Sequence, residues 1–110
     1  MSNGSKDNLT WLTHWYAAQC NGDWEHVYGV EIDTCDNPGW VVRIDLKDTK
    51  FAGRESDLMT SNLNDSDGDT SQRWYRCQII GNKFEGAGGV HDLSTIIEIF
   101  REWVNRNEEI

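Results

Sequence analysis

The stretch YGVEIDTCDNPGWVVRIDLK, residues 28–47, predicts a β-hairpin. Apolar side chains fill the even-numbered positions of residues 28–32, before the central DNPG turn, and of residues 40–46, after it. They alternate with mostly charged side chains, as in two half-buried strands of a hairpin. Residue numbers paired in an antiparallel hairpin add to a constant, and only an even sum keeps the two apolar faces together. A plain two-residue Pro-Gly loop would give the odd sum 77. We therefore predict an odd-length loop or a bulge, with a sum of 74 or 76 that places Arg43 opposite Glu31 or Asp33.

A helix is predicted before this hairpin, over about residues 8–20. Leu9, Leu12 and Tyr16 recur at helical spacing and form the predicted buried stripe, and Trp15 beside them is also expected to face the core. Asp7 or Asn8 is suited to cap the first turn, because a short polar side chain can accept a hydrogen bond from a free backbone N–H there.

The C-terminal helix has the clearest periodicity in the chain. Its apolar side chains recur at i, i+3, i+4, i+7, i+10 and i+11, which places them on one face of a helix that follows the N-cap residue Asp92. They are Leu93, Ile96, Ile97, Phe100, Trp103 and Val104.

Two further strands are predicted before that helix, over residues 74–80 and 83–87, joined by a tight Gly81-Asn82 turn. Together the elements predict an α+β fold, a four- to five-stranded antiparallel sheet with the N-terminal and C-terminal helices packed on one face. A chain of 110 residues predicts a single domain, residues 1–110. Within it we expect residues 1–7 to form a frayed tail and residues 54–72 a mobile acidic loop.

The charge balance restricts the kind of partner. The chain has 19 Asp and Glu against 10 Lys and Arg, a formal net charge of −9. Binding to nucleic acid needs clusters of basic side chains, so we expect neither nucleic acid nor an anionic membrane as a partner. An acidic surface favours basic protein partners and speeds their encounter, although solubility alone explains the charge equally well.

Cysteine usage and the N-terminus predict a cytoplasmic protein. The three cysteines, Cys20, Cys35 and Cys77, are odd in number and widely spaced, which argues against a disulfide framework. The N-terminal residues MSNGSKDN lack the apolar segment of a signal peptide. No apolar run approaches the roughly 20 residues of a membrane helix.

The densest polar cluster, CNGDWEH from Cys20 onward, raises the alternative of a small enzyme. A hydrolase or sulfur-transfer protein would use Cys20 as nucleophile, or Asp23 and Glu25 as an acid–base pair. Cys20 lies near a helix C-terminus, however, where the helix dipole disfavours the thiolate. A structural corner, in which Asn21 and Asp23 bond the turn backbone and Trp24 packs, explains the same residues. We therefore predict no catalytic residue.

No metal or other cofactor is expected. The three His and three Cys lack the short paired spacing of zinc ligands. The stretch DSDGD, residues 65–69, invites a calcium interpretation, but an EF-hand needs Gly at its sixth position and Glu at its twelfth. Thr70 and Arg76 occupy those positions, so a solvated acidic loop is the better interpretation.

Several motifs resemble those of one known family. They are, in order, QCNGDWEH from Gln19, YG from Tyr28, DNPGW from Asp36, IDL from Ile44, and FEG from Phe84 with Gly88 after it. By these motifs the chain resembles the immunity protein 53 family of bacterial polymorphic toxin systems, over about residues 9–104 without the 54–73 region.

The resemblance implies a small bacterial cytosolic protein that is made next to a toxin and neutralises it by occluding its active site or substrate cleft. It carries over no catalytic residue. A nuclease toxin with a basic cleft would suit an acidic inhibitor. On this hypothesis the partner-binding residues are a tryptophan and the acids around it, with three loop acids as outer steering charges. They are Asp23, Trp24, Glu25, Glu31, Asp33, Asp65, Asp67 and Asp69.

A protein-binding adaptor without a toxin partner is the remaining alternative. A toxin gene directly upstream would favour the immunity hypothesis. Repeated absence of such a gene would favour the adaptor.

Overall fold

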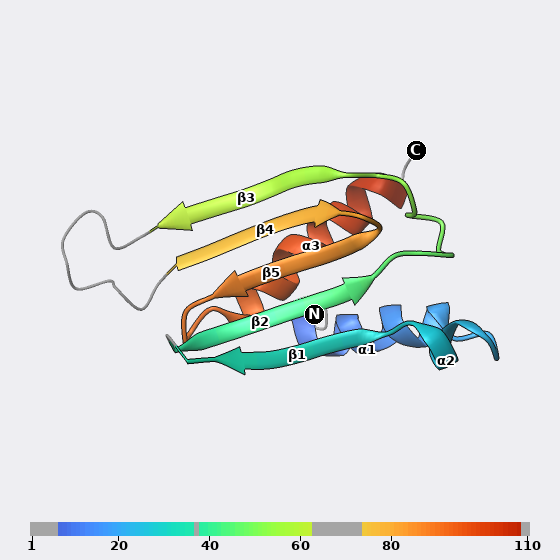
Figure 1. The fold of residues 1–110 in the computed structure, drawn as a ribbon, viewed down its shortest axis with the longest axis horizontal. Coiled ribbons are helices and arrows are strands. Elements are labelled where there is room, and N and C mark those ends of the chain that lie inside the picture. Colours follow the sequence, from blue (N-terminus) through green and yellow to red (C-terminus); the bar gives the residue numbers. More distant parts are fainter. Residues whose placement is uncertain (1–6, 37, 63–73, 109–110) are drawn as a thin grey trace.

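The computed structural model describes residues 7–36, 38–62 and 74–108. Its elements are α1 (Asn8–Gln19), α2 (Trp24–Val27), β1 (Val30–Cys35), β2 (Gly39–Asp45), β3 (Ser56–Asn62), β4 (Trp74–Ile80), β5 (Lys83–Gly88) and α3 (Leu93–Glu108). The strands form one antiparallel sheet in the order β1-β2-β5-β4-β3. Figure 1 shows α1 and α3 on the same face of this sheet. The predicted α+β fold, with both terminal helices on one face, is confirmed.

The hairpin of β1 and β2 has one of the two predicted registers. Paired residue numbers add to 74 along its whole length, so that Ile32 lies opposite Val42 and Glu31 opposite Arg43. Residues 36–38 connect the two strands, which is a connection of odd length. The predicted charge pair also forms, with 3.5 Å between Glu31 Oε1 and Arg43 Nη1.

The predicted mobile loop, residues 54–72, is wrong for the residues that form β3. Ser56–Asn62 pair antiparallel with β4 at one edge of the sheet. The backbone of an edge strand pairs with a single neighbouring strand, and this pairing does not require alternating apolar side chains. The polar sequence of β3 therefore resembles that of a loop. Residues 63–72 of the prediction, with Asp65, Asp67 and Asp69, lie outside the described residues.

The predicted frayed tail, residues 1–7, is wrong for its last residue. Asp7 caps α1 as expected, because its Oδ1 accepts a hydrogen bond from the backbone N–H of Thr10 at 3.1 Å. Hydrogen bonds from the Thr10 hydroxyl and backbone N–H lower the pKa of the Asp7 carboxyl. Residues 1–6 lie outside the described part of the chain.

The tight turn between β4 and β5 is confirmed. Gly81 and Asn82 are its two central residues, and both have φ of 62°. Positive φ at both positions is typical of the two-residue turn whose twist matches that of the flanking strands. Gly and Asn tolerate this conformation better than other residues do.

Aromatic side chains join the two long helices to the sheet. Phe100 of α3 is fully buried, and its ring centroid lies 5.0 Å from that of Phe84 in β5 and 5.1 Å from that of Trp15 in α1. The predicted apolar face of α3 is confirmed, since five of its six residues are buried and Leu93 packs against the same core.

The predicted buried stripe of α1 is wrong in part. Leu12 is buried, but Leu9 is 59% exposed and Tyr16 is 37% exposed. Trp15 is buried as predicted, and Trp11 packs its ring edge against Phe100 at 5.8 Å between centroids. Apolar residues occur on several sides of α1, so spacing alone does not identify the side that faces α3.

Candidate functional site

The sheet face opposite the helices has no helix over it among the described residues (Figure 1). Its side chains alternate with those of the core, and one row crosses four strands at Glu31, Arg43, Glu85 and Gln78. A shallow hollow of about 320 Å³ lies in this face, beside the small side chain of Ala87. The open face is therefore a broad, polar surface that suits contact with another molecule.

Among the described residues, most of the net negative charge lies before residue 49. Residues 7–48, which build α1, α2, β1 and β2, contain eight carboxylates and only two Lys or Arg. The described residues from 49 to 108 contain seven carboxylates and six Lys or Arg, so their charges nearly cancel. Within the described ranges, the β1 side of the sheet therefore carries the larger excess of negative charge, which attracts a basic partner.

Two of the predicted partner-binding residues, Glu31 and Asp33, share the open face of β1 and are exposed. The ion pair of Glu31 with Arg43 lies at the surface, where such a pair contributes at most about 1 kcal/mol. Asp33 Oδ1 accepts a hydrogen bond from the neighbouring Thr34 N–H at 2.8 Å. Neither carboxylate is committed to the core, so both are available to a partner.

The α1–α2 corner holds itself together with its own polar side chains. Asn21 Oδ1 accepts hydrogen bonds from the backbone N–H groups of Asp23 and Trp24, both at 2.9 Å. The Glu25 carboxylate accepts hydrogen bonds from the N–H groups of Asn21 and Gly22, each at 2.9 Å. The backbone N–H groups of Glu25 itself, Asn21 and Gly22 lower the pKa of the Glu25 carboxyl. Glu25 therefore stabilises the corner, and exposed Asp23 is the carboxylate that a partner can reach.

Replacing Glu25 with glutamine should destabilise the protein at neutral pH and have no effect in acid. A carboxyl whose pKa is lowered by folding stabilises the fold above its unfolded pKa, near 4.3, and this contribution disappears as the pH falls through the folded value. Thermal melting at pH 7 and about pH 2 measures the difference. Glu98→Gln, at an exposed position of α3, is the control and should change neither melting temperature. An equal loss at both pH values would contradict a role for the Glu25 charge.

Trp24, one of the predicted partner-binding residues, lies in the core rather than at the surface. Its side chain is 4% exposed, and its indole N–H donates to the Lys47 carbonyl at 2.9 Å. The ring packs against those of Trp15 and Tyr28. The corner is a short helix, and it places the indole N–H within hydrogen-bond reach of the Lys47 carbonyl.

The predicted partner-binding residues do not form one patch. The corner with Asp23 and Trp24 adjoins the end of β2, and Glu31 and Asp33 lie along β1 (Figure 1). Asn62 and Trp74, which flank residues 63–73, pair with each other at the opposite end of the sheet, where β2 begins. The structure thus places Glu31 and Asp33 together and leaves the flanks of the acidic loop remote from the corner.

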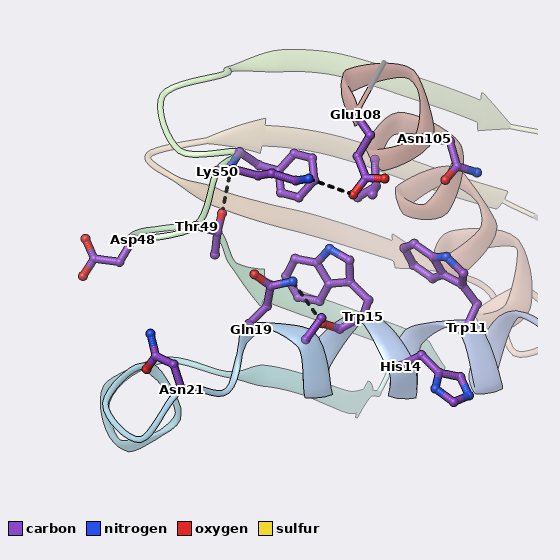
Figure 2. Close-up of a pocket in the computed structure, with 13 residues that line it drawn as sticks. Trp11, His14, Trp15, Gln19, Asn21, Asp48, Thr49, Lys50, Asn105 and Glu108 are labelled. Atoms are coloured by element: carbon purple, nitrogen blue, oxygen red, sulfur yellow. Dashed lines mark hydrogen bonds and ion pairs between the residues drawn. The ribbon is translucent and has the colours of Figure 1, made fainter. Parts of the chain in front are cut away.

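A groove that the sequence did not predict lies between α1, α3 and the segment after β2 (Figure 2). It encloses about 530 Å³, and buried rings of Trp15 and Phe51 form part of its floor. The ion pair of Lys50 and Glu108, 3.3 Å apart, lies at its rim. The Trp15 indole N–H is buried and has no hydrogen-bond acceptor among the described residues. Three separate segments build this groove, so no local motif indicates it.

A model of one protein family matches the chain over residues 9–105, and its description is Immunity protein 53. The chain belongs to the immunity protein 53 family. The match begins in α1 and ends in α3, and it spans all five strands. The resemblance that the sequence motifs indicated is confirmed, and with it an immunity function in the general sense. Neither a curated protein nor a solved structure matches the chain.

Two of the three cysteines of this immunity protein 53 member, Cys77 in the core and Cys20 at the end of α1, contribute to packing or hydrogen bonding of the fold. Burial raises the pKa of the Cys77 thiol to about 12, so this thiol stays protonated at neutral pH. Cys20 follows the last residue of α1, and its thiol donates to the Tyr16 carbonyl at 3.4 Å. No group of three or more His, Cys, Asp or Glu within residues 7–36, 38–62 and 74–108 is placed to hold a metal ion. Within the same ranges no helix is both long and apolar enough to cross a membrane.

Proposed function

We propose that this chain neutralises a cognate bacterial toxin by binding it and occluding its active site or substrate cleft, and that it does so without catalysis. The observation that carries the proposal is the acidic surface on the β1 side, where Glu31 and Asp33 stand exposed on one face. A toxin with a basic cleft, such as a nuclease, presents the complementary charge. Family membership supports the same conclusion, because an immunity protein needs a toxin as partner.

The predicted contact residues take different roles in this proposal. Asp23, Glu31 and Asp33 are exposed and contact the toxin directly. Trp24 and Glu25 hold the corner that presents Asp23. The loop acids add long-range attraction; they are Asp65, Asp67 and Asp69.

Co-expression with the toxin encoded beside this chain tests the proposal. Cells that produce both proteins should grow, cells that produce the toxin alone should not, and the two proteins should co-purify. Full toxicity in the presence of folded chain, or failure to form a complex, would contradict the proposal.

Changing Asp65, Asp67 and Asp69 together to asparagine should slow association with the toxin and leave dissociation almost unchanged. Charges outside the direct contact act mainly on the encounter rate. Screening shortens their range to about 10 Å at 0.1 M salt and to about 3 Å at 1 M, so the difference from wild type should shrink at high salt. Stopped-flow kinetics at both salt concentrations measures this effect. A change confined to dissociation would instead place these side chains in the direct contact.

A further inference from the structure

The two edges of the sheet differ. Among the described residues β1 pairs only with β2, and β3 at the other edge pairs only with β4 (Figure 1). The pairing of β3 with β4 shifts register between Asp57 and Met59. Such an irregularity in an edge strand disfavours pairing with a further strand. The pairing of β1 with β2 is regular throughout, and β1 contains no proline. β1 is therefore the edge that remains suited to accept another strand.

The register fixes which backbone groups of β1 face this free edge. The Asp45 N–H donates to the Gly29 carbonyl at 3.0 Å, which marks these two residues as a hydrogen-bonded pair. Such pairs alternate along an antiparallel ladder, so the odd-numbered residues of β1 bond to β2 and the even-numbered ones direct their N–H and C=O groups outward. Ile32 lies in the middle of the outward-facing set. The Thr34 N–H, also in this set, already donates to an exposed side-chain oxygen.

The free edge is accessible. Residues 31–34 are all exposed, and the Ile32 side chain is 38% exposed although it lies on the helix-covered face of the sheet. An incoming strand could therefore form backbone hydrogen bonds and also cover the Ile32 side chain.

The charge on β1 distinguishes between possible partners. In an antiparallel pair of two β1 strands centred on Ile32, Glu31 of each copy would lie opposite Asp33 of the other. Like charges directly opposite each other are destabilising. A strand with Lys or Arg at the facing positions would form opposite-charge pairs instead. Because the proposed toxin surface is basic, a strand of the toxin fits this edge better than a second copy does.

We propose that the toxin pairs one of its own strands with β1, extending the sheet, with basic side chains opposite Glu31 and Asp33. This inference rests on the proposed function and adds the mode of contact. Hydrogen bonds to the outward backbone of β1 fix the position of the toxin strand, and the two carboxylates select its charge.

Amide hydrogen exchange of the full chain, followed by NMR with and without the toxin, tests this mode of binding directly. The Ile32 amide should exchange rapidly in the free chain and at least about tenfold more slowly in the complex, because a hydrogen bond to the toxin strand would protect it. A complex in which Ile32 exchange is unchanged would overturn the inference while leaving the proposed function standing. Protection of Ile32 in the chain alone, lost on dilution, would show self-pairing and would also overturn it. Absence of any complex would overturn the proposed function together with the inference.

Two substitutions at one position separate the backbone contribution from that of the side chain. Ile32→Pro removes the outward N–H and leaves the bonds between β1 and β2 intact, as proline at a solvent-facing edge position permits. Ile32→Ala shortens the side chain and retains the N–H. We expect Ile32→Pro to weaken toxin binding about tenfold more than Ile32→Ala does. Equal affinities for the two variants, both folded by circular dichroism, would contradict strand pairing at Ile32.

Discussion

Replacing Trp24 with alanine is expected to lower the free energy of unfolding by about 3–5 kcal/mol. The side chain is 4% exposed, and its ring centroid lies 6.0 Å from that of Tyr28 and 6.4 Å from that of Trp15. Removing it would leave a cavity lined by the rings of Trp15, Tyr16 and Tyr28. Urea denaturation followed by circular dichroism measures the loss.

Trp24→Phe separates ring packing from the hydrogen bond. Phenylalanine retains most of the apolar contact but cannot donate to the Lys47 carbonyl, so a smaller loss of about 1–2 kcal/mol is expected. Below their unfolding transitions, both variants should still protect against the toxin. A Trp24→Ala variant with wild-type stability and lost protection would instead make Trp24 a direct anchor of the toxin.

The sequence predicted those parts of the fold that follow from local patterns. Alternation on both sides of the DNPG turn permitted only an even register sum, and the structure has the sum 74. The same parity placed Glu31 and Asp33 on one face of one strand, so this part of the candidate site was also predictable. The Gly81-Asn82 turn and the face of α3 were predictable because a single residue pattern determines each.

The remaining parts depend on packing between distant segments. When Trp24 is buried, its indole N–H needs an acceptor, and the backbone carbonyl of Lys47 provides it. No local pattern in the sequence indicates this contact. The orientation of α1 depends on the contact of Trp15 with Phe100, which lies 85 residues further along the chain. β3 was not predicted because its sequence shows no apolar alternation, although its backbone pairs with β4.

Reversing the charges of Glu31 and Asp33 together, by Glu31→Lys and Asp33→Lys, is expected to have the largest effect on toxin binding. Each reversal turns an attraction to a basic partner into a repulsion, and close charge pairs in interfaces contribute about 1.5–7 kcal/mol. The double variant should therefore bind at least about a hundredfold more weakly. Both side chains are exposed, so the free energy of unfolding should fall by no more than about 1–2 kcal/mol, because Glu31→Lys removes the ion pair with Arg43 and places a like charge opposite it.

A matched control keeps the same change in net charge but places it elsewhere. Glu98 and Glu102 are exposed on α3, on the other side of the molecule from the open face of β1. Glu98→Lys with Glu102→Lys should slow association modestly through the weaker overall field and leave dissociation unchanged.

We propose that the acidic β1 side of this chain holds the toxin. Isothermal titration of the toxin into wild type, the Glu31/Asp33 double variant and the Glu98/Glu102 double variant measures it most directly. Our account predicts tight binding by the wild type and the Glu98/Glu102 variant, with a loss of at least about a hundredfold for the Glu31/Asp33 variant. Equal affinities for all three proteins would place the toxin on another surface and contradict the claim.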